Sequence, residues 1–231
     1  TIAVIGVGAG SFSWSGGASG NWTTGGNWTL DSGSDDGTNG YPDGSDTALI
    51  DVGGAVVTFD SAITIGGVTI NGDASTELTL SAAMDVNGAV DVQTGSLTTN
   101  GNQINVAGDW TVVNGSGVFN EGTGTVVFDL ASGGSASIST GGTAADYQFN
   151  NVIFDDAGAG SIFQLLGNEL NAAGDVTITG GAFDLNGLGM TVSGVYNNSD
   201  ILQLNGDETT LAFTNDTASG TTRYVTGGAS G

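Results

Sequence analysis

The chain has 231 residues, 38% of them apolar, and it carries 24 acidic side chains against a single basic one, Arg223, for a formal net charge of −23. This charge argues against nucleic acid and anionic membrane surfaces as partners, because both require clustered lysine or arginine. The 43 glycines follow no period of three, which excludes collagen, and the absence of cysteine excludes disulfides, so stability must come from packing.

Residues 1–10 are expected to form a strand without charge on either face. Such a strand needs cover on both sides. It either adds the first strand to its own sheet or pairs with the next subunit by strand addition. In the second case the subunit-contact side chains are Ile2, Val4, Ile5 and Val7.

Residues 11–60 are expected to form a cap rich in Trp and Asp. Trp14, Trp22 and Trp28 occur among Gly, Ser and Thr, and large aromatic side chains are suited to closing the open end of a repeat protein. The alternative is that these three rings are exposed and stack on sugar rings, which would make them a carbohydrate site.

An acidic loop at residues 31–46 holds the chain's one proline. Its carboxylates repel one another unless they are solvated or bridged, and hard cations prefer such oxygen ligands. No cofactor is expected to be required, and Ca²⁺ is the candidate ion; the alternative is a solvated acidic turn. The spacing matches no EF-hand. The candidate ligands are Asp31, Asp35, Asp36, Asp43 and Asp46.

From residue 47 onward, short apolar segments recur every six to eight residues (about the length of a short strand plus a tight turn). Asn-Gly pairs, which accept positive φ readily, separate many of them. The fold class is therefore all-β. Three such strands make a coil of about 20 residues, which favours a parallel β-helix, or β-solenoid. An antiparallel β-sandwich built of hairpins is the alternative.

Two stretches resemble each other at a distance of 86 residues, 91–108 and 177–194. We interpret the chain as two repeats of about 85 residues, 61–145 and 146–231, stacked on one another. The apolar positions should be buried and should occupy equivalent places in the two copies. These pairs are Leu97 with Phe183, Ile104 with Met190, and Val106 with Val192.

The order of these motifs, Trp-Ser-Gly, Asn-Trp, DTALI, GSLTTNGNQINVAGDW and GAFDLNGLGMTVSG, resembles the repeat-rich β-solenoid surface proteins of bacteria. These include autotransporter-passenger-like proteins and large adhesins. The resemblance implies an extracellular, cell-surface, β-helical protein used for attachment or assembly. This chain is shorter than typical members.

The function classes differ in how well the composition supports them. An enzyme is not expected, because the chain has no His, Cys or Lys and its adjacent acids, such as Asp155 and Asp156, point to opposite faces of a strand. The expected function is an extracellular structural subunit that self-assembles into a fibre, sheath or surface layer, which makes it a homo-oligomer or polymer. The alternative is a cell-surface adhesin or carbohydrate-binding fragment with glycan partners. No stretch suits membrane insertion, which takes about 20 apolar residues.

Overall fold

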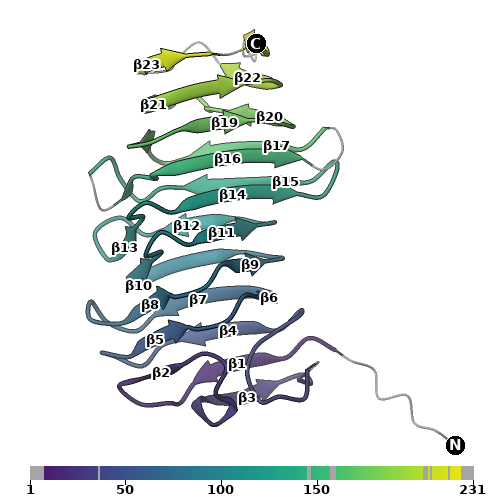
Figure 1. Cartoon of the computed structure of the whole chain (residues 1–231), viewed down its shortest axis with the longest axis vertical. Helices are drawn as coiled ribbons and strands as arrows, with labels where there is room; N and C mark the ends of the chain where they lie inside the picture. The colour runs from purple at the N-terminus through teal and green to yellow at the C-terminus, as the bar shows by residue number, and fades with distance from the viewer. Residues whose placement is uncertain are drawn as a thin grey trace, which may run out of the picture.

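The computed structural model describes residues 8–35, 37–144, 147–156, 160–204, 208, 210–217 and 219–224. Their strands wind into a column of about eight turns, with the N-terminal coils at one end and the C-terminal coils at the other (Figure 1). Every strand pairing among them is parallel except that of β1 with β3. The parallel β-helix prediction is confirmed, and the antiparallel sandwich is wrong. No helix of these residues is long and apolar enough to cross a bilayer.

Each coil crosses three faces of the column in turn. The first face contains β1 (Ser11–Trp14), β4 (Thr47–Ile50), β7 (Gly67–Asn71), the first half of β10 (Val90–Thr98), β12 (Trp110–Val112), β15 (Ser135–Ser139), β17 (Ile162–Leu166), β20 (Ala182–Asp184), β22 (Ile201–Leu204) and β24 (Thr221–Tyr224). At the N-terminal end, β3 (Trp28–Ser32) runs antiparallel to β1, after the short 3₁₀ turn η1 (Gly25–Asn27).

The second face contains β2 (Ser19–Asn21), β5 (Val56–Phe59), β8 (Glu77–Leu80), the second half of β10 and β13 (Gly117–Asn120). It continues with Phe149, β18 (Leu170–Ala172) and the first halves of β21 (Met190–Asn198) and β23 (Leu211–Asp216). The third face contains β6 (Ile63–Ile65), β9 (Met84–Val86), β11 (Gln103–Val106), β14 (Thr125–Leu130), β16 (Asn151–Asp156), β19 (Val176–Ile178) and the second halves of β21 and β23.

The core is a set of in-register columns of apolar side chains. Successive side chains of a strand point to opposite sides of the sheet, so every second side chain points into the column and contacts its counterpart in the next coil. Ile50, for example, pairs with Ile70, which pairs with Val92, and Val92 pairs with Val112; all four are buried. The alternation of apolar and polar residues in the sequence therefore directly produces a continuous interior.

The predicted turn chemistry holds at two corners. Asn100 and Asn186 adopt positive φ (50° and 52°), and the glycine that follows each also has positive φ. Asn tolerates this region better than other side chains and Gly has no Cβ to clash. These corners join strands on different faces of the solenoid, where a hairpin would have joined antiparallel neighbours.

The six apolar residues of the internal repeat are all buried, as predicted. Their equivalence is wrong. Leu97 lies on the second face, where it pairs with Leu78 and Phe119, whereas Phe183 lies on the first face and pairs with Phe163 and Leu202.

The reason is unequal coil length. Phe183 pairs with a residue 19 positions on, whereas Trp110 pairs with Ile138, 28 positions on, and Ile138 with Leu165, 27 positions on. Because these two coils are longer than the others, 86 residues do not complete four coils. A residue 86 positions further along the chain therefore lies on the preceding face. The second copy is turned by one face relative to the first.

Candidate functional site

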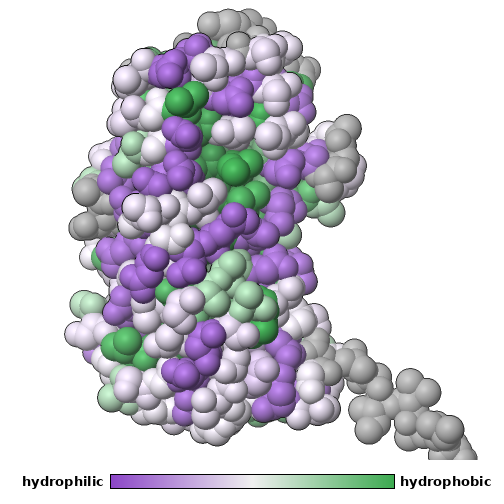
Figure 2. Space-filling model, viewed as in Figure 1, coloured by the Kyte–Doolittle hydropathy of each residue, from purple (hydrophilic) through white to green (hydrophobic). Residues whose placement is uncertain are grey.

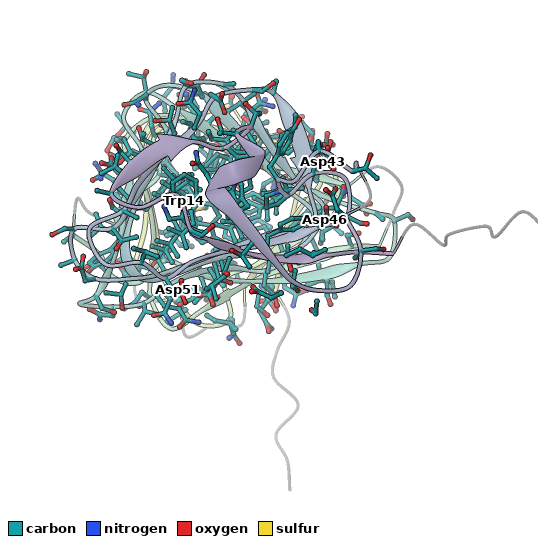
Figure 3. All side chains as sticks on the ribbon, turned by 90° about the horizontal axis from the view of Figure 1, so that it is seen from below. Trp14, Asp43, Asp46 and Asp51 are labelled. Carbon is teal, nitrogen blue, oxygen red and sulfur yellow. The ribbon has the colours of Figure 1, made fainter. Side chains whose placement is uncertain are left out.

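The three N-terminal tryptophans close the end of the column. Trp14, Trp22 and Trp28 are 2%, 0% and 6% exposed. Their rings meet edge to face, with centroids 5.1 Å apart for Trp14 and Trp28 and 4.6 Å for Trp22 and Trp28, and Trp22 also contacts Phe59 at 5.0 Å. Seen along the column axis, Trp14 lies inside the ring of strands (Figure 3).

The indole N–H groups of this cap are satisfied within it. Trp14 donates to the carbonyl of Gly17, Trp22 to that of Pro42, and Trp28 to that of Trp22. A side chain at Gly20 would place its Cβ 2.6 Å from the Asn27 amide, which explains a glycine beside the stacked rings. A ring that stacks on a sugar must expose a face, so the carbohydrate-stacking alternative for these three residues is wrong.

The acidic loop brings three of its five aspartates together. Asp35, Asp43 and Asp46 each offer a carboxylate oxygen, and these atoms all lie within 4.8 Å of one another. Asp46 is fully buried, and Asp43 and Asp46 lie on the same side of the cap, away from Asp51 (Figure 3). Asp36 lies outside the described residues, so its place in the cluster is not assigned.

Asp31 does not join this group. It belongs to β3, where its Oδ1 accepts a hydrogen bond from the Ser13 hydroxyl at 3.1 Å. There it lines a hollow of about 370 Å³ on the first face, with Ser11 and Thr47. Asp31 is therefore not part of the group of close carboxylates formed by Asp35, Asp43 and Asp46, and of the five predicted calcium ligands the structure brings these three together.

The cluster accepts hydrogen bonds from two donors of the loop and from one residue before β1. The backbone N–H of Gly40 donates to Asp35 Oδ2 at 2.7 Å, the Asn39 amide donates to Asp43 Oδ2, and the N–H of Gly10 donates to Asp46 Oδ1. Asp35 Oδ1 is buried and accepts no hydrogen bond from the described residues. Three carboxylates at this distance could supply part of the six to eight oxygen ligands that Ca²⁺ takes.

A second acidic group, on the third face, was not found from the sequence. Asp129 on β14 pairs in register with Asp155 on β16, so two like charges stand on adjacent strands. Burial, and after it the negative charges of Asp85 and Asp155, raise the pKa of Asp129 to about 6. The two residues are 26 positions apart, and only knowledge of that coil's length could have placed them side by side.

Figure 2 shows one side of the column, where hydrophilic bands surround smaller apolar areas.

The adjacent pair Asp155 and Asp156 points to opposite sides of the strand, as expected: Asp155 is exposed and Asp156 is buried.

The proposed subunit-contact residues Ile2, Val4, Ile5 and Val7 lie outside the described residues. The neighbouring residues 8–10 are held by their own subunit, because the carbonyl of Gly10 accepts from the N–H of Thr47 at 2.9 Å and Gly8 N–H donates to the Ser34 hydroxyl.

The two ends of the first-face sheet are edge strands. Four of the five residues of β3 are exposed, and β24 pairs on one side with β22. No other described strand pairs with the outer edge of either.

Comparison of the chain with family models, with curated proteins and with solved structures finds no match.

Proposed function

We propose that the protein is an extracellular structural subunit that assembles into a fibre, sheath or surface layer through β-strand contacts between subunits. The observation that supports this most directly is the topology of the first-face sheet, which runs the length of the column from β3 to β24. Each edge strand carries unpaired backbone donors and acceptors, which are a template for another chain. A heterologous contact between opposite ends repeats without closing and produces a filament.

The composition supports an extracellular location. A chain with one arginine and no lysine offers trypsin-like proteases a single cleavage position, which suits a protein exposed on a surface. The parallel solenoid supports a structural role, because each coil is stabilised by its neighbours along one axis. The adhesin alternative loses its main support, since the three tryptophans that favoured it are buried in the cap.

The test is assembly of the purified chain. We expect sedimentation and negative-stain electron microscopy to show filaments or sheets above a critical concentration. High salt should lower that concentration, because screening weakens the repulsion between subunits of charge −23. A chain that remains monomeric at millimolar concentration, with and without salt and Ca²⁺, would refute the proposal.

A further inference from the structure

The first-face sheet ends in two strands of opposite direction. The strands from β1 to β24 on this face are all parallel, and β3 alone is reversed. When two copies are stacked head to tail, β3 of one copy faces β24 of the other, and the two run antiparallel. Antiparallel pairing is slightly more stable per residue than parallel pairing.

The charges on these two strands are complementary. Arg223, the chain's single basic residue, is in β24, in register with Gln203 of β22. Gln203 alternates with the buried Leu202 and Leu204, so this register position is on the outer side of the sheet. Asp31 in β3 also lies on the outer side, because its carboxylate accepts from Ser13, which alternates with the buried Phe12 and Trp14.

We propose that subunits join end to end by antiparallel pairing of β3 of one copy with β24 of the next, with Asp31 opposite Arg223. The inference rests on the proposed function and specifies the contact within it. The partner is thus a second copy of this chain, and the first-face sheet continues through the joint.

The same register matches the inner side of the sheet. With Asp31 opposite Arg223, Leu30 stands opposite Tyr224. Leu30 pairs in register with the buried Phe12 but is itself 43% exposed, and Tyr224 pairs in register with the buried Leu204. The joint therefore places an exposed apolar side chain of β3 at the core position of the neighbouring edge, where it can be covered.

Pairing between like ends is disfavoured by the same charges. Two β3 strands in contact would bring Asp31 near its own copy, and two β24 strands would bring Arg223 near its own copy; like charges on paired strands are destabilising. An acidic residue on an edge strand is a common protection against self-pairing. Here Asp31 disfavours pairing with β3 of another copy and favours pairing with β24, so assembly proceeds head to tail.

The first test uses charge exchange in the full chain. Asp31→Arg and Arg223→Asp should each raise the critical concentration for assembly about fivefold, from the lost ion pair and the new repulsion. The double variant Asp31→Arg/Arg223→Asp, which keeps the net charge, should return it to within about twofold of the original. The control Asp51→Arg alters the net charge as Asp31→Arg does, at an exposed position outside β3, and should not raise it.

Assembly of the unchanged chain together with equal behaviour of Asp31→Arg and Asp51→Arg would overturn this joint and leave the proposed function standing. Failure of the unchanged chain to assemble would overturn both. Circular dichroism of each variant monitors the fold, and Asp31 is exposed, so the exchange should leave the column intact.

The second test uses cysteine, which the chain lacks. Opposed residues of an antiparallel pair have Cβ atoms about 4.5–5.5 Å apart, within small adjustments of disulfide geometry. Oxidation of assembled Asp31→Cys/Arg223→Cys should give a ladder of covalent multimers. Each single cysteine variant, assembled and oxidised in the same way, should form no covalent multimers. Dimers from Asp31→Cys or from Arg223→Cys alone, without a ladder from the double variant, would overturn the head-to-tail pairing.

Discussion

Replacement of Phe183 by alanine tests how the stacked core carries the stability of the column. Phe183 is fully buried on β20, pairs in register with Phe163 and Leu202, and stacks on Phe154 with ring centroids 4.1 Å apart and planes at 17°. Removing a buried phenyl ring leaves a cavity and typically costs 3–5 kcal/mol. Part of that cost is the aromatic contact, about 1 kcal/mol. We expect Phe183→Ala to lower the free energy of unfolding by about 4 kcal/mol.

The matched control is Ile162→Ala. Ile162 begins β17, beside the same coil, but its side chain is 44% exposed. Its truncation should cost about 1 kcal/mol, since roughly half of the side chain already contacts water. Both variants are measured by urea denaturation.

Two probes separate local from global unfolding. All four tryptophans lie at or before Trp110, so fluorescence reports the N-terminal half, whereas far-ultraviolet circular dichroism reports every coil. Because coils of a solenoid interact mainly with their neighbours, the dichroism of Phe183→Ala should be lost at lower urea than the fluorescence changes. A cost within 1 kcal/mol of that of Ile162→Ala would refute the stacked-core reasoning.

The charges and the N-terminal segment lead to three further predictions. Asp129→Asn should stabilise the protein by about 1 kcal/mol at pH 7, after allowance for solvent screening of a partly exposed carboxylate, and should have no effect near pH 4. The reason is that the pKa of Asp129 is raised, so its stabilising protonated form is lost as the pH rises through about 6. Melting temperatures that depend on pH identically in the two proteins would contradict this. Millimolar Ca²⁺ should raise the melting temperature, and Asp43→Asn should remove that rise while the exposed control Asp51→Asn keeps it; equal losses in the two would leave only charge screening. If the sheet edges make the joint, deletion of residues 1–7 should leave the critical concentration for assembly within about twofold of that of the full chain. Loss of assembly in sedimentation assays after this deletion would instead assign the contact to the N-terminal strand.

The sequence predicts local features of this fold better than relations between coils. The rhythm of apolar segments is sufficient for parallel strands and a buried core, because inward and outward positions alternate in every coil. The tryptophan cap is predictable because the exposed core at the first coil needs large side chains to cover it. The face on which each residue lies is not predictable, because it depends on the cumulative length of all preceding coils.

Two examples show this dependence. Leu97 and Phe183 match in sequence but lie on different faces, since the two long coils between them shift the register. Asp31 is close in sequence to Asp35 but separated from it in space, because β3 reverses along β1 and directs Asp31 toward Ser13. Neither the long coils nor the reversal has a local sequence signal as strong as an Asn-Gly turn.

The strong preference for aspartate has an explanation in the geometry of the corners. Only four of the 24 acids are glutamate. At several corners a short carboxylate accepts a backbone N–H from an adjacent coil: Asp73 from Gly54, Asp109 from Ser137, Asp175 from Val195, and Asp200 from Gly181. The pKa of Asp73 is lowered by the backbone N–H of Ser75, in its own turn, and then by that of Gly54, in the adjacent coil.

On the flat faces, side-chain hydroxyl groups donate hydrogen bonds to the carboxylates of an adjacent coil. The Thr64 hydroxyl donates to Asp85 at 2.8 Å and the Thr179 hydroxyl to Asp155 at 3.0 Å. A carboxylate that receives hydrogen bonds from an adjacent coil ties the two coils together without any cation, because each donor favours the charged form. Asp129 departs from this arrangement, since its in-register neighbour on β16 is a second aspartate and its Oδ1 is buried without a donor among the described residues. The acidic composition is thus compatible with stable stacking wherever the adjacent coil supplies a donor, and the column should respond to pH first where it supplies another acid.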